Sequence, residues 1–124
     1  MRGFIGYCIF VLLMAGLVHA QQKKLKVLIS ADMEGVGGVN SWDVQTDPKG
    51  HDYEKFRRLM TEEVNAAVAG AVAAGATDFL VVDSHNGQDI DNELLDKRAR
   101  LIRGWPRPLS MVKASTPRST RRCL

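Results

Sequence analysis

Two periods of hydrophobic and polar residues divide the middle of the chain. Residues 24–31 begin with alternation and become continuously apolar, which is typical of a strand in a sheet covered on both faces. Over residues 52–74 the apolar positions recur in steps of three and four, which predicts an amphipathic helix that stops at Gly75. Residues 78–83 are too short for a helix and rich in β-branched valine, and they predict a second buried strand.

The segments after the second strand are shorter. Residues 92–100 predict a short helix, and residues 101–102 predict the start of a third strand. Beyond them, prolines among Ser, Thr and Arg leave little periodicity. A strand, a helix and a strand form a βαβ unit, in which both strands run parallel and end at the same edge of the sheet. The predicted fold class is therefore α/β, a βαβ-type parallel sheet with flanking helices.

The first 20 residues have the pattern of a secretory signal peptide. Arg2 precedes an apolar run over residues 4–18, and residues 18–20 are small or modest in size where a signal peptidase would cut. The run is shorter than the ~20 residues that a spanning helix needs, so we expect no stable membrane anchor. We expect a periplasmic or secreted protein. Cleavage would remove Cys8 and leave Cys123 alone, so no intramolecular disulfide is expected.

Charge is distributed unevenly along the chain. All 14 acidic residues fall at or before Asp96, whereas residues 97–124 contain nine Lys or Arg and no acid. A basic tail of this kind can bind an anionic surface or nucleic acid. One hypothesis for the chain is therefore a non-catalytic α/β binding module with a basic tail, which would be retained on heparin in a salt-dependent way.

Ionisable residues follow both predicted strands. Asp32 and Glu34 come after the first strand, and Asp83 and His85 end the second, each pair spaced so that its side chains point the same way. Because parallel strands end at one edge, we expect the two pairs to meet in the crevice where open α/β sheets bind ligands. Without a cation, carboxylates gathered there would repel one another.

A divalent cation would relieve the repulsion in this predicted cluster. Carboxylate oxygens with an imidazole nitrogen suit zinc, manganese or iron better than calcium. A cation held there can acidify water and polarise a carbonyl, which is the chemistry of amide hydrolysis. Two alternatives stay open. Asp and Ser after strands often cap helices or form turns, and acids after a first strand also serve metal-dependent phosphohydrolases, although Glu34 stands where those enzymes usually have Asp.

Four segments along the chain carry a family resemblance. They are S-A-D-M-E-G-V-G-G-V from Ser30, Y-E-K-F-R-R-L-M-T-E-E-V-N-A-A-V from Tyr53, V-V-D-S-H-N-G from Val81 and L-I-R-G-W-P-R-P-L-S-M-V from Leu101. In this order and spacing, they resemble the zinc-dependent D-aminopeptidase family associated with dipeptide-transport operons. The similarity covers about residues 25–112 and is therefore specific.

The resemblance implies a site and an activity. Asp32, Glu34 and His85 would be ligands in a site for two zinc ions, with Asp32 bridging and Asp83 orienting a ligand from outside the coordination sphere. Family members release N-terminal D-amino acids from short peptides and assemble as large homo-oligomeric rings. Residues 21–112 are accordingly expected to form part of a metallopeptidase α/β domain, the truncated N-terminal part of a larger domain.

The resemblance also implies what lies beyond this chain. Family members are more than twice as long, and a further ligand His, a ligand Glu and a catalytic His come after the point where this sequence stops. We therefore expect the chain to be inactive alone and to contain no catalytic residue. Residues 113–124 are an irregular basic tail. Restoring one G after the Lys113 codon of a GC-rich back-translation gives the family's continuation, so we hypothesise that residues 114–124 are out of frame and expect no nucleic-acid partner.

Overall fold

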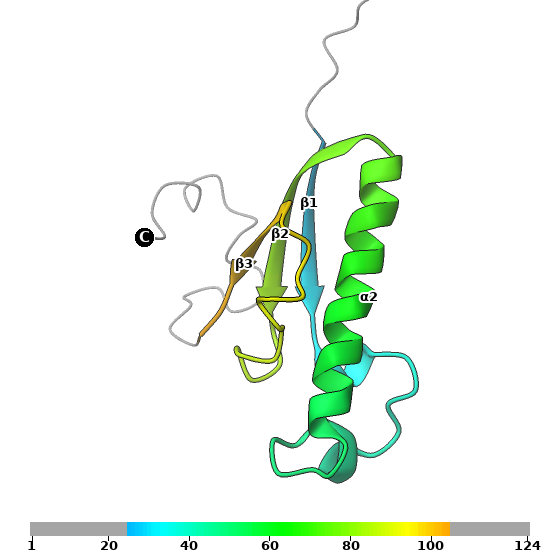
Figure 1. Cartoon of the computed structure of the whole chain (residues 1–124), viewed down its shortest axis with the longest axis vertical. Helices are drawn as coiled ribbons and strands as arrows, with labels where there is room; N and C mark the ends of the chain where they lie inside the picture. Colours follow the sequence, from blue (N-terminus) through cyan, green and yellow to red (C-terminus); the bar gives the residue numbers. More distant parts are fainter. Residues whose placement is uncertain (1–24, 105–124) are drawn as a thin grey trace, which may run out of the picture.

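The computed structural model describes residues 25–104, so the predicted signal peptide (1–20) and basic tail (113–124) lie outside the described residues. Three strands, β1 (Leu25–Ala31), β2 (Ala76–Asp83) and β3 (Ala99–Ile102), form a sheet in the order β1-β2-β3. Both strand pairs are parallel. Helix α2 (Tyr53–Ala73) lies along one side of the sheet (Figure 1). The predicted α/β class and parallel βαβ arrangement are confirmed.

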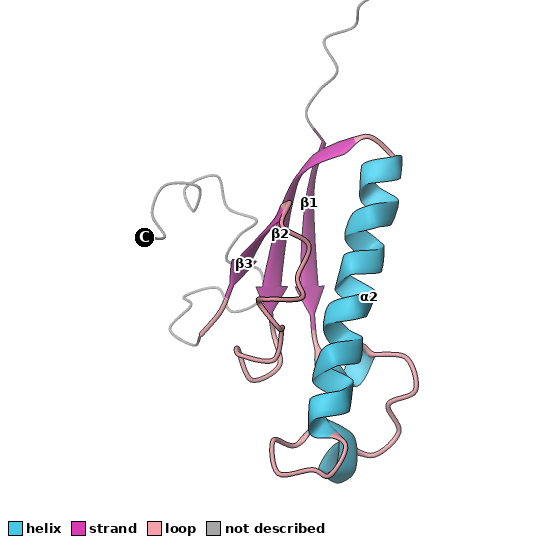
Figure 2. Ribbon diagram, viewed as in Figure 1, coloured by secondary structure: helices cyan, strands magenta, loops and turns pink. Residues whose placement is uncertain are grey.

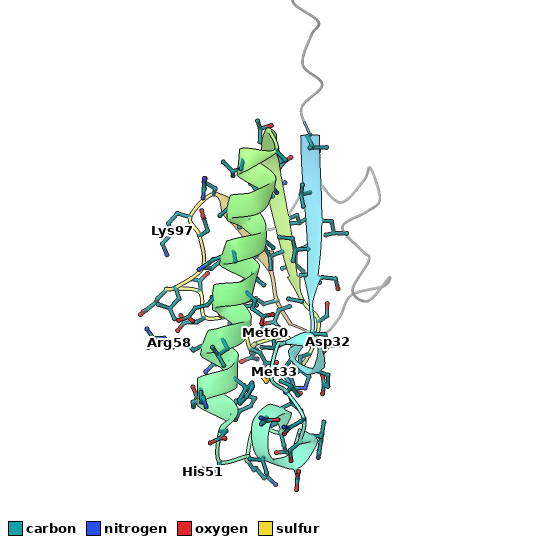
Figure 3. All side chains as sticks on the ribbon, turned by 90° about the vertical axis from the view of Figure 1, so that its right-hand side faces the viewer. Asp32, Met33, His51, Arg58, Met60 and Lys97 are labelled. Atoms are coloured by element: carbon teal, nitrogen blue, oxygen red, sulfur yellow. The ribbon has the colours of Figure 1, made fainter. Side chains whose placement is uncertain are left out.

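Helix α2 is held to the sheet by a stripe of buried side chains. Phe56, Met60, Val64 and Val68 recur every fourth residue and are at most 5% exposed. This spacing places them on one face of an α-helix, as the sequence predicts. Figure 3 shows Met60 on the side of α2 that faces β1, close to Met33. The main core cluster consists of Met33, Val36, Phe56, Met60, Val64, Val81, Ile90 and Leu95.

The end of α2 matches the predicted stop. Gly75 follows the last helical turn with φ of 89°, and its N–H donates to the carbonyl of Val72. A residue with a side chain is strained in this left-handed conformation, which explains why glycine ends the helix here. The chain then enters β2 directly at Ala76.

The carboxyl ends of β1 and β2 are level with each other. Ala31 pairs with Asp83, and the N–H of Ser84 donates to the carbonyl of Ala31 at 2.8 Å, one step beyond the strand. The hydroxyls of Ser30 and Ser84 lie 2.7 Å apart. The residues that leave the two strands therefore start from neighbouring points on the same edge of the sheet.

Short helical turns and loops connect β1 to α2. A 3₁₀ turn, η1 (Met33–Gly35), follows β1 after one residue, and a π-helical turn, η2 (Trp42–Thr46), comes later. Met33 and Thr46 are completely buried and fasten these turns to the body of the protein.

The predicted helix over residues 92–100 is wrong. Residues 92–98 are a series of turns, shown as loop in Figure 2, and the chain enters β3 at Ala99. The carboxylate of Asp91 accepts the N–H groups of Glu93 and Leu94, and that of Asp96 accepts the N–H of Arg98. Such local side-chain bonds favour turns over a continuous helix.

No helix in residues 25–104 has the length and apolar character that crossing a membrane requires.

Candidate metal centre

Asp32, Glu34 and His85 come together at the carboxyl edge of the sheet. Each offers one ligand atom, and these atoms lie within 4.8 Å of one another. Within residues 25–104, no other group of three or more His, Cys, Asp or Glu side chains meets this spacing. The convergence predicted from two strand ends is therefore present, while the role of these residues as ligands remains a prediction.

The backbone around η1 determines where the carboxylates of Asp32, which precedes the turn, and Glu34, which lies in it, are placed. Asp32 is extended, with φ of −132° and ψ of 135°, and its side chain makes no capping hydrogen bond to η1. Met33 between them is buried in the core, so Asp32 and Glu34 face outward, as Figure 3 shows for Asp32 at the end of β1. The helix-capping alternative for Asp32 is thus not what the structure contains.

Glu34 connects η1 to the rest of the site. Its Oε1 lies 3.1 Å from Nε2 of His85 and 3.2 Å from the hydroxyl of Thr46, which donates to it. The side chain of Glu34 is 46% exposed, whereas that of His85 is only 11% exposed. An anionic, accessible oxygen next to a mostly buried imidazole nitrogen is a suitable pair of donors for a divalent cation.

Asp32 and Glu34 differ in their affinity for a proton. Burial, the hydrogen bond with Glu34 and the charge of Glu34 raise the pKa of Asp32. Burial also acts to raise the pKa of Glu34, but hydrogen bonds from Asp32, the backbone and Thr46, together with His85, outweigh it and lower the pKa of Glu34. Acidification would therefore protonate Asp32 before Glu34. Cation binding would compete with that protonation, because metals bind carboxylates in the ionised form.

The loop after β2 fixes the position of His85. Asp83 is completely buried, and its Oδ2 accepts the N–H of Ile90 at 2.8 Å, which ties the far end of the loop to the end of the strand. Burial is the main cause that raises the pKa of Asp83, and the Ile90 hydrogen bond opposes it. This bond acts on the loop backbone, and the orienting role that the family resemblance implies for Asp83 stays a prediction.

Gly87 allows a close contact within the same loop. Its φ is 75°, and its carbonyl accepts the N–H of Gly104 at 2.8 Å. A Cβ at Gly87 would lie 3.2 Å from the Gly104 nitrogen. Both the left-handed backbone and the tight approach favour glycine at this position.

Sequence reasoning missed Asp89 and Tyr53. Asp89 is completely buried and lies 2.9 Å from Nδ1 of His85, and Tyr53 donates its hydroxyl to Asp89. The four-residue spacing of His85 and Asp89 was the available signal, but in a loop such spacing does not imply contact. Tyr53 is 36 residues away along the chain, so only the docking of α2 brings it close.

An open pocket lies beside Asp32. It occupies about 290 Å³ between the β1 side of the sheet and α2, and Glu63 stands in its lining. Glu63 also accepts the N–H of Gly37 at 2.9 Å, which fastens the loop after η1 to the helix. The pocket gives a ligand space next to the cluster. Its lining residues are Ile29, Ser30, Ala31, Asp32, Gly35, Val36, Met60, Glu63, Val64 and Ala67.

Comparison with known proteins decides the family. The family model described as D-aminopeptidase, peptidase family M55, matches residues 25–120. The chain belongs to the D-aminopeptidase family. This confirms the resemblance seen in the four sequence segments.

Two relatives show how much of a D-aminopeptidase the chain represents. A D-aminopeptidase of Bacillus subtilis (strain 168) is 40% identical over 90 residues, which are 72% of this chain and 32% of that protein. The solved structure of the Zn-dependent D-aminopeptidase DppA from Bacillus subtilis, described as a self-compartmentalizing protease, matches with a TM-score of 0.67 and 39% identity. This structural match covers 71% of the present chain and 32% of DppA. The chain thus spans about a third of the length of the relatives it matches.

Proposed function

We propose that the chain is the N-terminal, cation-binding part of a zinc-dependent D-aminopeptidase, an enzyme that releases N-terminal D-amino acids from short peptides. One observation carries the proposal: in a member of the D-aminopeptidase family, Asp32, Glu34 and His85 converge within 4.8 Å at the carboxyl edge of a parallel sheet. The relative DppA is described as Zn-dependent, which supports zinc as the cation.

The chemistry of the three donors fits zinc. Two carboxylates and an imidazole are common zinc ligands, and Asp32, Glu34 and His85 are the residues that would hold the zinc. When bound, such a cation supplies a Lewis acid that polarises the scissile carbonyl and activates water. The protein's own contribution is to hold Glu34 and His85 face to face. Zinc takes at least four donors, so residues 25–104 supply part of the coordination sphere.

Zinc binding by this chain tests the proposal directly. Glu34→Gln and His85→Ala should each weaken zinc binding at least tenfold, measured by competition with a chromogenic chelator, because each removes a ligand. Glu62→Gln is the matched control, since Glu62 lies exposed on α2 and pairs with Arg58. Equal zinc affinity in the wild-type chain and all three variants would reject the metal site.

Hydrolysis needs a test on a longer protein. We expect a version of this chain extended to the length of its relatives to release D-alanine from a D-alanyl dipeptide and to lose this activity in the presence of a chelator. The L-alanyl dipeptide is the comparison substrate. An extended protein that binds zinc and cleaves neither dipeptide would overturn the proposed activity and leave the metal site intact.

Two further proposals concern the location and assembly of the protein. We propose export by cleavage of residues 1–20, and the check is N-terminal sequencing of the mature protein, which should begin at Gln21.

We also propose that the extended protein is a homo-oligomer, in view of the self-compartmentalizing relative. Sedimentation velocity should then show a species many times the monomer mass.

A further inference from the structure

The imidazole of His85 lies between two carboxylates of different character. Its Nε2 is 3.1 Å from Oε1 of Glu34, and its Nδ1 is 2.9 Å from Oδ2 of Asp89. Glu34 is 46% exposed and belongs to the cation cluster, whereas the side chain of Asp89 is completely buried. One ring nitrogen thus faces the proposed metal site and the other faces the protein interior.

Asp89 has hydrogen-bond donors on both carboxylate oxygens. Tyr53 donates its hydroxyl to Oδ1, and the N–H of Asn86 donates to Oδ2 at 2.7 Å. A buried carboxylate is costly unless it is hydrogen-bonded, and these donors meet that need. They also fix the direction in which the carboxylate can point.

Helix α2 holds the Asp89 backbone as well as its side chain. Nε of Arg57 donates to the carbonyl of Asp89 at 3.2 Å, and Nη2 donates to the carbonyl of Gln88 at 3.4 Å. Tyr53 and Arg57 are one helical turn apart in α2. Asp89 lies in the loop after β2, and these bonds anchor it to a rigid helix.

The position of Asp89 selects one tautomer of His85. A carboxylate can only accept a hydrogen bond, so Asp89 requires the proton on Nδ1. Glu34 favours a proton on Nε2 in the same way when no cation is present, and a bound cation takes the Nε2 lone pair in place of that proton. The side-chain nitrogen of Asn86 also lies 2.9 Å from Nδ1. If the Asn86 amide is rotated by half a turn, its oxygen faces Nδ1 and accepts the same proton. The Asp89 carboxylate has no donor that it could present in this way.

We propose that Asp89 is a positioning residue for the metal site, which holds His85 as the Nδ1–H tautomer with Nε2 directed at the cation, and that Tyr53 fixes the Asp89 carboxylate. The inference rests on the proposed function of the site as a cation centre. Histidines that bind metals usually donate their other N–H to a carboxylate, a carbonyl or water, which orients the ring and raises its basicity as a ligand.

A purely structural role for Asp89 makes a different prediction. Its bond from Asn86 N closes the loop after β2, and on this view alone Asp89→Asn would alter stability but leave the His85 tautomer and the zinc affinity unchanged. The positioning role predicts changes in both properties even where the variant is fully folded.

The test uses the full chain and compares three variants. In Asp89→Asn, the amide can turn its NH₂ toward Nδ1, so we expect a shift of His85 toward the Nε2–H tautomer and zinc affinity lower by about 10- to 100-fold. Tyr53→Phe keeps the carboxylate and removes one donor, so we expect a smaller loss of about twofold to tenfold. Asp91→Asn is the matched control, because Asp91 bonds the N–H groups of Glu93 and Leu94.

Two measurements separate the outcomes. Long-range ¹H–¹⁵N NMR of the metal-free chain reports which ring nitrogens of His85 carry a proton, with the ring assigned from His85→Ala, and chelator competition reports zinc affinity. A wild-type ring with no proton on Nδ1, or a folded Asp89→Asn variant with wild-type affinity, would refute the positioning role. A wild-type chain that binds no zinc contradicts the proposed function instead. The NMR measurement of the Nδ1 proton then decides by itself whether Asp89 positions the ring of His85. If Asp89→Asn unfolds, Tyr53→Phe supplies the affinity comparison.

Discussion

The carboxylates around His85 differ in burial, and burial determines which of them a cation can reach. Asp32 and Glu34 are exposed and can face a cation, whereas Asp83 and Asp89 are completely buried and bond to the loop that carries His85. An exposed carboxylate can exchange a proton or water for a metal, but a buried one is stable only with its donors in place. On the proposed function, the exposed carboxylates would bind the cation and buried Asp89 would position the ring of His85.

Tyr53 should ionise only at very high pH. Burial, followed by the hydrogen bond to Asp89 and its charge, raises the pKa of Tyr53 to about 12. Because the folded-state pKa is above the unfolded value near 10, this contribution to stability is complete below pH 10 and is lost as the pH rises through about 12. Ultraviolet difference titration should show the late step, and Tyr53→Phe should remove it. A Tyr53 that ionises near pH 10 would show that its contact with Asp89 is absent.

At the scale of elements, Met60 of α2 and Met33 of η1 belong to the core cluster that joins the helix to the sheet. Met60 is 1% exposed and lies in the main core cluster with Met33. We expect Met60→Ala to lower the free energy of unfolding by about 2–5 kcal/mol, because it leaves a cavity, and Met60→Leu to cost less than about 1.5 kcal/mol. Urea unfolding followed by circular dichroism measures both. A similar small loss in the two variants would mean that α2 is not packed on the sheet as described.

Periodicity was enough to predict the elements that build the site. The buried stripe of α2 and the largely buried β2 reflect burial along a regular backbone, whereas β1 is apolar but only half-buried or exposed. Parallel pairing of β1 with β2 then places Asp32 beside His85. Asp89 and the turns at residues 92–100 could not be predicted in this way. Their structure depends on side-chain bonds to the backbone and on a tyrosine from α2, and no period in the sequence records such contacts.

A row of charges links the three strands on one face of the sheet. Asp78 in β2 lies 3.6 Å from Nζ of Lys26 in β1 and 2.7 Å from Nη2 of Arg100 in β3. The hydrogen bond from Arg100 is the main cause that lowers the pKa of Asp78, and burial opposes it. Since the folded-state pKa is lowered, the stabilisation is present above pH ~4 and is lost as the pH falls through the folded-state value.

Asp78→Asn should therefore remove a small, pH-dependent share of the stability. We expect a loss of about 0.2–1 kcal/mol at neutral pH and low salt, less at high salt, and none in acid below the folded-state pKa, because the side chains are partly exposed. Urea unfolding at several values of pH and salt measures this difference. Asp47→Asn, at a loop carboxylate that bonds the N–H of Lys49, is the control. A loss that is the same at every pH would contradict an ionic origin.

At the scale of the whole molecule, the described helix covers only one face of the sheet. Val27 and Ile29 of β1 pack against the core on the α2 side, while Leu28 between them is 37% exposed. Parallel sheets in α/β proteins normally have both faces covered. Within residues 25–104, the face with Leu28 is therefore a candidate for contact with other protein, in keeping with a chain that spans about a third of its relatives' length.

We expect this face to promote self-association of the chain, and Leu28→Lys to reduce it. The substitution places a charge on the exposed side of β1, where it disfavours burial against a second molecule. Sedimentation velocity over a range of concentrations should show less association for the variant. Leu94→Lys is the matched control, because Leu94 is 39% exposed but lies in the loop before β3. If both variants reduce association equally, added charge is the cause; if only Leu28→Lys does, the sheet face is the contact surface.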